Sequence, residues 1–413
     1  MPPRPLVAVL SFPGNNCEVE SVRMIRRNGM EALYFRWNDD RSKLKDADAY
    51  FIPGGFSYED RGRSGMVAGR DPLMDFIRQE AEAGKAVIGN CNGAQILVES
   101  GLIPLCDGLR MSLARNAVRE GGHYRATGFL SEWVWITPTG GRDRCATSDW
   151  EGAMHLPIAH GEGRFTTNDK DLFSELKKNN QIAFSYCDET GQVSDSVDVT
   201  PNGSTFAAAG ICNPAGNVVA LMPHPERTDN GDPYFASLRR WIEKGPRTTV
   251  PVKNILTPIT IGTHVTGNVE LFIDTIIVNN EERTVEQTAR RMVPSLKLKQ
   301  WKYFCIPQEA VSRALADLTI FNPNKERAFI RSGKDIKRWK ADGKADEKAD
   351  ARLFAGTLFL RRDIPDTGAD AFGKGAETGI AYGIGGISEQ DISSNSGLLE
   401  VFCNPHSSVL ERL

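Results

Sequence analysis

The first 245 residues alternate short apolar segments with longer segments whose apolar residues recur at helical spacing. Short runs rich in β-branched residues predict buried strands, and a 3.6-residue period predicts amphipathic helices. The predicted strands are residues 6–12, 32–37, 49–52, 86–89 and 218–222, and the predicted helices are residues 18–28, 72–83 and 94–100. Because strands and helices alternate, we expect an α/β fold with an open, mostly parallel sheet and helices on both faces.

The pattern changes after a stretch of glycine, proline and polar residues at 245–249, which predicts a domain boundary. We therefore divide the chain into a domain of residues 1–245 and a smaller α+β domain of residues 246–413. Predicted strands of the second domain are residues 269–278, 299–306, 356–360 and 398–402, and its predicted helices are residues 284–292 and 308–318. Residues 331–352 carry dense charge of both signs and predict a solvated helix or a loop. The glycine-rich residues 382–386 predict a loop.

Composition narrows the functional classes. The net charge of −3 gives no electrostatic basis for binding nucleic acid. No apolar run reaches transmembrane length, and the N-terminus enters a strand without the apolar region of a signal peptide. The eight cysteines form no C-x-x-C pair, which argues against a zinc site and against a disulfide framework. We expect a reduced, cytoplasmic protein without a metal and without membrane attachment.

One cysteine lies where a nucleophile is expected. Residues 87–97 read VIGNCNGAQIL, so Cys91 falls between a buried strand and a helix, flanked by Gly89 and Gly93. This arrangement corresponds to the G-x-S-x-G nucleophile elbow with sulfur in place of the hydroxyl. The helix N-terminus favours the thiolate. A buried apolar role is common for cysteine, but this context favours a nucleophile.

A base and a carboxylate occur together near the end of this domain. Residues 218–227 read VVALMPHPER, so an apolar strand leads into His224 between two prolines, with Glu226 following. Proline neither donates to a sheet nor continues a helix, which predicts a rigid exit loop. His224 is suited to accept the thiol proton, and Glu226 is suited to orient the imidazole. The sequence therefore predicts a Cys91–His224–Glu226 triad.

These two segments resemble the class I glutamine amidotransferases, whose domain is flavodoxin-like and whose Cys-His-Glu triad releases ammonia from glutamine. Within that family the chain looks like the PurQ-type glutaminase subunits of phosphoribosylformylglycinamidine synthase. The resemblance covers roughly residues 4–244 and includes further segments: FPGNNC at 12–17, PGGFSY at 53–58, AHGEGRF at 159–165, PNGS at 201–204 and AGICN at 209–213. Two alternatives are a binding or regulatory protein on the same scaffold and an amidotransferase that serves a different synthetase.

The resemblance also implies roles for other residues. Backbone N–H groups near Gly55 and Asn92 are expected to form the oxyanion hole. Gln95, His160 and Gly161 are expected to line the glutamine pocket, with His160 structural rather than a second base, and Cys17 is not expected to be a second nucleophile. The chain has no G-x-x-x-x-G-K-[ST] loop, so ATP and Mg²⁺ are expected on a partner synthetase subunit. A small bridging subunit is a further expected partner. The sequence of residues 246–413 leaves three roles open for this extension: an accessory module, a docking domain or a second enzyme.

Overall fold

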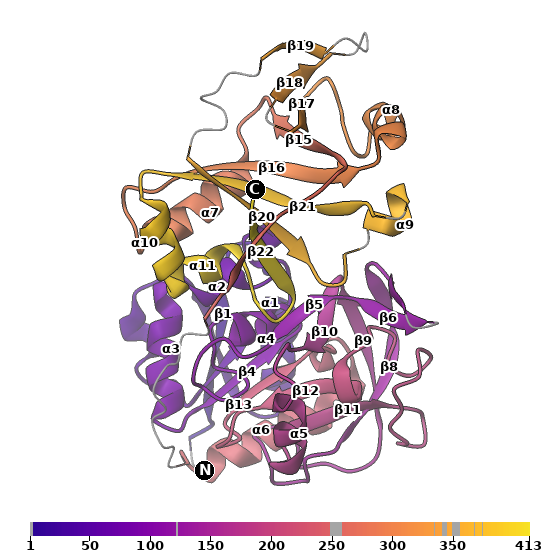
Figure 1. The fold of residues 1–413 in the computed structure, drawn as a ribbon. Helices are drawn as coiled ribbons and strands as arrows, with labels where there is room; N and C mark the ends of the chain where they lie inside the picture. Colours follow the sequence, from indigo (N-terminus) through magenta and orange to yellow (C-terminus); the bar gives the residue numbers. More distant parts are fainter. Residues whose placement is uncertain are drawn as a thin grey trace. The chain divides into compact units, whose positions relative to one another are not determined.

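The computed structural model describes residues 3–120, 123–247, 258–333, 335–340, 345–348, 356–366, 368–373 and 375–413. The chain divides into two compact units, residues 1–257 and residues 258–413 (Figure 1). The predicted boundary at 245–249 falls partly on residues 248 and 249, which lie outside the described residues, and the predicted division at residue 245 stays a prediction. No helix among the described residues is both long and apolar enough to cross a bilayer.

The first unit is built on a nine-stranded sheet in the order β2-β1-β3-β4-β13-β12-β11-β8-β9. Strands β2 to β13 pair in parallel, and the strands from β13 to β9 pair antiparallel. The strands of the unit are β1 (Leu6–Ser11), β2 (Glu31–Arg36), β3 (Ala49–Ile52), β4 (Ala86–Asn90), β5 (Ser112–Arg115), β6 (Ala117–Glu120), β7 (His123–Ala126), β8 (Leu130–Pro138), β9 (Met154–His160), β10 (Glu162–Thr166), β11 (Ile182–Cys187), β12 (Ala208–Cys212) and β13 (Val218–Leu221). Its helices are α1 (Glu18–Arg27), α2 (Met66–Gly69), α3 (Pro72–Glu82), α4 (Asn92–Glu99), α5 (Leu172–Lys178) and α6 (Asp232–Glu243).

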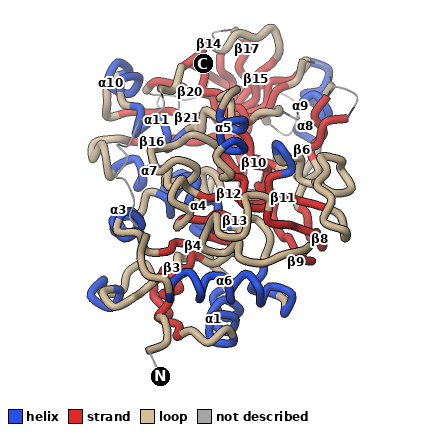
Figure 2. The backbone as a smooth tube through the Cα atoms, turned by 90° about the horizontal axis from the view of Figure 1, so that it is seen from below, coloured by secondary structure: helices blue, strands red, loops and turns tan. Residues whose placement is uncertain are grey.

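Helices cover both faces of this sheet. Successive side chains along a strand point to opposite faces, so each buried strand contributes apolar residues to both. Ala8 and Leu10 of β1 pack in one core with α3 and α4. Val7 and Val9 point to the other face and pack in a second core with α1 and α6, two helices that lie side by side in Figure 2. The predicted α/β class is confirmed.

The second unit contains another nine-stranded sheet, in the order β14-β22-β20-β21-β16-β15-β17-β18-β19. Its strands are β14 (Ile261–Thr263), β15 (Val269–Thr275), β16 (Lys297–Ile306), β17 (Glu326–Ser332), β18 (Asp335–Trp339), β19 (Ala345–Lys348), β20 (Thr357–Asp363), β21 (Glu377–Gly385) and β22 (Ser408–Arg412). Its helices are α7 (Asn280–Arg290), α8 (Val311–Ala316), α9 (Gly368–Phe372), α10 (Glu389–Ser394) and α11 (Ser396–Phe402). The predicted α+β class of the second domain is confirmed.

Three local predictions for this unit are wrong: the strand at 398–402, the loop at 382–386, and the helix or loop at 331–352. Residues 398–402 belong to helix α11, where the Asn395 side chain accepts a hydrogen bond from the backbone N–H of Leu398 and so caps the helix. The glycine-rich residues 382–385 lie in β21, which pairs with β16 and β20. Glycine suits position 383 because a Cβ atom there would lie 3.1 Å from the Trp301 ring.

The charged stretch 331–352 is not a helix or a loop where the structure describes it. It contains the end of β17 and strands β18 and β19, which pair antiparallel at one edge of the sheet. Charged side chains are common on edge strands, because they oppose pairing with other chains. Residues 334, 341–344 and 349–352 lie outside the described residues.

Candidate active site

The predicted triad lies at the carboxyl ends of two adjacent parallel strands, β4 and β13. Leu221 pairs with Asn90, and the backbone N–H of Cys91 donates to the Leu221 carbonyl oxygen (2.7 Å). The nucleophile and the loop that carries His224 therefore leave the sheet next to each other. The carboxyl ends of parallel strands are where open α/β sheets bind their ligands.

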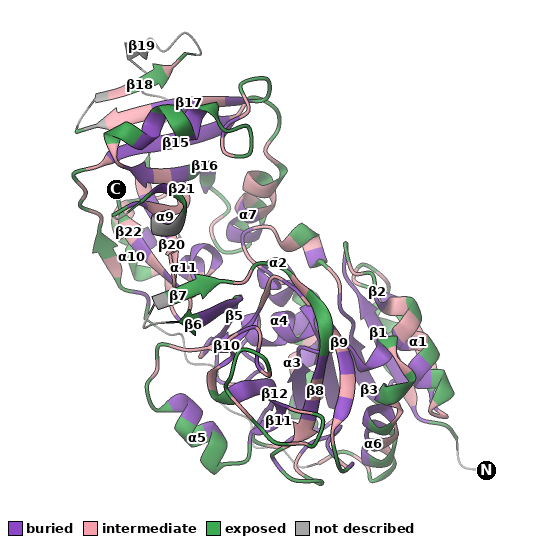
Figure 3. Cartoon of the chain, turned by 90° about the vertical axis from the view of Figure 1, so that its right-hand side faces the viewer, coloured by how far each residue is buried: buried purple, intermediate pink, exposed green. Residues whose placement is uncertain are grey.

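Cys91 forms a strained turn between β4 and α4. Its backbone angles are φ 50° and ψ −108°, an uncommon conformation for a residue with a side chain. A Cβ atom at Gly89 would lie 2.4 Å from the Gly93 carbonyl oxygen, and one at Gly93 would lie 2.0 Å from that of Ile52. Close packing at both positions therefore requires glycine. All of α4 is buried (Figure 3), so the elbow is held rigidly.

His224 and Glu226 lie in direct contact. The distance between His224 Nδ1 and Glu226 Oε1 is 2.5 Å, and both side chains are buried. Burial alone lowers the pKa of His224, but the nearby Cys91 thiolate and the Glu226 carboxylate raise it well above its ordinary value. Burial alone raises the pKa of Glu226, but His224 more than offsets this and leaves that pKa below its ordinary value. The arrangement favours a protonated imidazole beside an ionised carboxylate.

Two further residues fix the carboxylate, and the sequence analysis missed both. The Asn90 side-chain amide donates from Nδ2 to Glu226 Oε2 (3.0 Å), and its Oδ1 accepts from the Tyr234 hydroxyl (3.0 Å). All three side chains are buried. The polar Asn90 at the end of a buried strand was the available signal, because a buried amide requires partners.

Cys17 approaches the imidazole from the turn after β1. Its Sγ lies 4.0 Å from His224 Nδ1 and accepts a hydrogen bond from Arg227 Nη2 (3.0 Å). Cys17, His224 and Glu226 together offer three metal-ligating atoms within 4.8 Å of one another. Nδ1 of His224 is already bonded to Glu226, so this set is better explained as part of the proton-transfer site.

The loop predicted to supply the oxyanion hole is joined to the start of α4. Gly55 has φ 139°, and a Cβ atom there would lie 2.6 Å from Asn15 Cα, so only glycine fits. The Asn92 side chain accepts a hydrogen bond from the backbone N–H of Ser57 (3.0 Å). This contact connects the Gly55 loop to the helix N-terminus. The role of both N–H groups in binding an oxyanion stays a prediction.

The three residues predicted to bind the substrate, Gln95, His160 and Gly161, have different local environments. The Gln95 amide donates to the Glu162 carbonyl oxygen (2.5 Å) and accepts from Asn92 Nδ2 (2.8 Å). His160 is buried, and burial together with the charge of His224 lowers its pKa to about 3. A neutral His160 agrees with a structural role. A Cβ atom at Gly161 would make an ordinary contact with Phe129 Cδ2 at 3.8 Å. Contact of these three residues with glutamine stays a prediction.

A protonatable carboxyl group lies beside the helix N-terminus. Asp60 accepts a hydrogen bond from Asn92 Nδ2 (3.3 Å). Burial, and next the negative charge of Glu162, raises the pKa of Asp60 to about 7. No sequence pattern pointed to this group, because only the fold brings Asp60 and Glu162 close together.

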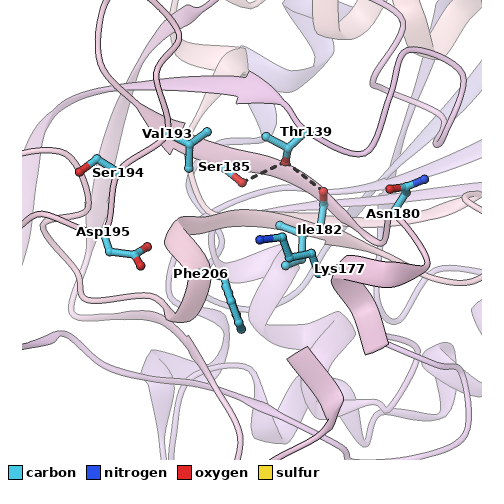
Figure 4. A pocket seen from close by; sticks show the side chains of 9 residues that line it. All are labelled: Thr139, Lys177, Asn180, Ile182, Ser185, Val193, Ser194, Asp195 and Phe206. Carbon is cyan, nitrogen blue, oxygen red and sulfur yellow. Dashed lines mark hydrogen bonds between the residues drawn. The ribbon is translucent and has the colours of Figure 1, made fainter. Parts of the chain in front are cut away.

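A pocket of about 450 Å³ lies on the antiparallel part of the unit (Figure 4). It is bordered by β11 and by side chains that include Lys177, Asp195 and Phe206. None of the predicted site residues lines it, so this pocket is not assigned to the triad.

Comparison with known proteins places these residues in a family. Residues 4–240 match the CobB/CobQ-like glutamine amidotransferase domain. The chain is 40% identical over 257 residues to phosphoribosylformylglycinamidine synthase subunit PurQ of Methanothrix thermoacetophila, covering 58% of this chain and 98% of the relative. It is 36% identical over 243 residues to the PurQ subunit of Pyrococcus furiosus, covering 57% of this chain and 97% of that relative.

A chain of the solved PurLQS structure from Thermotoga maritima is 29% identical, with a TM-score of 0.45 and coverage of 58% of this chain and 99% of that one. The resemblance seen in the sequence motifs is confirmed by the family match and by the curated relatives. The chain belongs to the glutamine amidotransferases with a CobB/CobQ-like domain, and its first unit belongs to their PurQ branch.

Proposed function

We propose that this chain is the glutaminase subunit of phosphoribosylformylglycinamidine synthase. It hydrolyses glutamine to glutamate and ammonia, and the ammonia serves a synthetase subunit. The observation that carries this proposal is the buried His224–Glu226 pair beside the strained Cys91 elbow, in a chain of the PurQ branch. A reduced nucleophilic thiol is needed for this chemistry, which supports a cytoplasmic location.

The first half of the reaction forms a thioester. The Cys91 thiolate attacks the side-chain amide carbon of glutamine, and the carbonyl oxygen becomes an oxyanion. We assign the stabilisation of that charge to backbone N–H groups at Gly55 and Asn92. One such donor contributes about 3–4 kcal/mol in comparable sites. Protonated His224 then donates a proton to the departing nitrogen, and ammonia leaves.

The second half of the reaction restores the enzyme. Neutral His224 accepts a proton from water, which attacks the γ-glutamyl thioester and releases glutamate. Glu226 holds the imidazole through Nδ1 in both halves, so Nε2 is the atom that gives and takes the proton. Nε2 is buried and makes no hydrogen bond to the residues that the structure describes. It is therefore free for this exchange.

Partner subunits supply the rest of the synthesis. We assign ATP and Mg²⁺ to a synthetase subunit that activates formylglycinamide ribonucleotide and uses the ammonia to form formylglycinamidine ribonucleotide. The name PurLQS of the Thermotoga maritima structure supports a complex of three kinds of subunit. For the second unit, the accessory, docking and second enzymatic roles all stay predictions.

The test measures glutamate and formylglycinamidine ribonucleotide in mixtures of the full chain, a synthetase subunit, ATP and formylglycinamide ribonucleotide. With glutamine as the nitrogen source, both products should require this chain. With ammonium chloride, the ribonucleotide product should form without it. A folded chain that yields neither product from glutamine, in a mixture that works with ammonium, would support a binding protein or an amidotransferase for another synthetase.

Replacement of Gly54 by alanine should weaken the glutaminase without unfolding it. A Cβ atom at Gly54 would lie 2.6 Å from His224 Cε1 and 3.1 Å from Cys17 Sγ, so the imidazole must move. Misplacement of a catalytic group by about 1 Å costs on the order of 10²-fold in rate. We expect that loss in kcat/KM, measured as glutamate release in the complete mixture. Gly267→Ala is the matched control, because no atom lies within 4 Å of its Cβ position; equal activity in both variants would contradict the placement of His224.

A further inference from the structure

Arg227 has an unusual hydrogen-bond partner. Its Nη2 donates to Cys17 Sγ (3.0 Å), although sulfur is a weak acceptor. Arginine usually pairs with carboxylates, and the next residue in the chain, Glu226, carries one. Among the residues that the structure describes, however, Arg227 forms no ion pair with a carboxylate, whereas Glu226 is bonded to His224 and Asn90. The sulfur therefore takes the place that a carboxylate usually has.

The sulfur of Cys17 is held in a fixed position. Cys17 lies in the turn between β1 and α1, where its backbone N–H donates to the Gly54 carbonyl oxygen (3.4 Å). Its side chain is fully buried, and its Sγ–H group donates to Asn16 Oδ1 (3.2 Å). Because the thiol proton is directed to Asn16, the lone pairs of the sulfur are left to accept from Arg227.

The same sulfur lies directly beside the His224–Glu226 pair. Cys17 Sγ is 4.0 Å from His224 Nδ1 and within 4.8 Å of a Glu226 carboxylate oxygen. Burial lowers the pKa of Arg227, but its contact with Cys17 and the charge of Glu226 raise that pKa above its ordinary value. The guanidinium is thus close enough to interact with the carboxylate. If the sulfur were removed, a short side-chain movement would give Arg227 a stronger acceptor in Glu226.

We propose that Cys17 is a positioning residue that holds the Arg227 guanidinium away from the Glu226 carboxylate. Glu226 then keeps its full charge for His224, whose protonated form it stabilises. Arginine and carboxylates commonly pair through two parallel hydrogen bonds. Such a pair would draw Glu226 Oε1 from His224 Nδ1, and the imidazole would lose both its orientation and its charge partner. This role of Cys17 rests on the glutaminase function proposed above.

The other titratable groups around His224 increase the importance of this placement. The Cys91 thiolate favours the imidazolium, as Glu226 does. His160 adds no charge, because burial and next the charge of His224 lower its pKa to about 3. Arg227 therefore brings a positive charge to a site that stabilises an imidazolium, so its distance from Glu226 affects the pKa of His224.

The test compares Cys17→Ala with the Cys17→Ala, Arg227→Gln double variant. In Cys17→Ala, kcat for glutamate release in the complete mixture should fall on the order of 10²-fold, the cost of misplacing a catalytic group by about 1 Å. The alkaline limb of the kcat profile should begin about one pH unit lower or more, because a neutralised Glu226 no longer raises the pKa of His224. The double variant should regain most of the activity and the parent limb, because no cation is left to capture the carboxylate.

Two cysteine variants are the matched controls. Cys17→Ser keeps an acceptor for Arg227 and should retain most of the activity that Cys17→Ala loses. Cys187→Ala removes a sulfur from another buried site of the first unit and should not move the limb. Arg227→Gln alone should not move the limb to lower pH, since it only removes a positive charge near His224. If Cys17→Ala does not fold, Cys17→Val takes its place, because valine fills the site without offering an acceptor.

A double variant as impaired as Cys17→Ala would overturn the proposal, because the loss would then come from packing around the sulfur. A parent-like kcat and limb in Cys17→Ala would overturn it as well. The pKa of His224, measured by NMR on chains with labelled histidine, makes the same comparison without catalysis: it should fall in Cys17→Ala and return in the double variant. This shift in a chain that releases no glutamate would uphold the role of Cys17 and remove only the proposed glutaminase function.

Discussion

Cys91→Ala should lower glutamine hydrolysis by about 10⁴- to 10⁶-fold, the range seen when the nucleophile of a catalytic triad is removed. No other thiol replaces it, because Cys17 is engaged by Arg227 and lies on the Nδ1 side of His224. The alanine methyl group fits wherever the Cys91 Cβ atom lies, so the fold should persist. Glutamate release in the complete mixture measures the loss, and circular dichroism checks the fold.

The control for this variant is Cys106→Ala. Cys106 is also a free cysteine of the first unit with a positive φ (60°), but it is only partly buried and lies outside the triad. Alanine keeps the Cβ atom of cysteine at both positions, so neither substitution adds backbone strain. We expect Cys106→Ala to keep full activity. A Cys91→Ala chain that retains hydrolysis would remove the thioester from the mechanism and with it the proposed role of the elbow.

The nucleophile and its base were predictable because each depends on a local pattern. An apolar strand, two glycines and a cysteine define an elbow whatever surrounds it, and the structure gives Cys91 the strained backbone that an elbow requires. The two prolines around His224 likewise define a loop by themselves. Parallel pairing of the two strands then brings both loops together.

The support of the triad was not predictable, because it depends on contacts between distant segments. Asn90 and Glu226 are separated by 136 positions, and nothing in either segment specifies their hydrogen bond. The secondary structure of the second unit was even less predictable from the sequence. The apolar run at 398–402 suits a strand or a helix equally, and only the cap at Asn395 decides for the helix. Glycines near 383 suggest a loop until Trp301 is seen packed against them.

Glu226→Gln should lower kcat about 10³- to 10⁴-fold with the fold intact, because it leaves the imidazole in the wrong tautomer. Asn90 Oδ1 accepts from the Tyr234 hydroxyl, so Asn90 must present its N–H group to residue 226. The oxygen of the new amide then faces Asn90, and its NH₂ group faces His224 Nδ1. His224 must place its proton on Nε2, where it cannot accept the proton of the thiol.

The same variant should also change the pH dependence. The Glu226 carboxylate stabilises protonated His224, so its removal lowers the pKa of His224. Activity that needs the imidazolium is present below this pKa and is lost as the pH rises through it. The alkaline limb of the kcat profile should therefore begin at a lower pH in Glu226→Gln than in the parent chain. An unchanged limb would show that Glu226 does not act on the charge of His224.

A second substitution separates the tautomer effect from simple loss of charge. Tyr234→Phe removes the hydroxyl that fixes Asn90, so Asn90 is free to turn its oxygen toward residue 226. In the Tyr234→Phe, Glu226→Gln double variant, the new amide can then turn its own oxygen to His224 Nδ1 and restore the productive tautomer. We expect the double variant to be more active than Glu226→Gln alone, although Tyr234→Phe by itself lowers activity. If the double variant is no better than Glu226→Gln, the hydrogen-bond chain from Tyr234 does not set the tautomer, and the charge of Glu226 alone accounts for its effect.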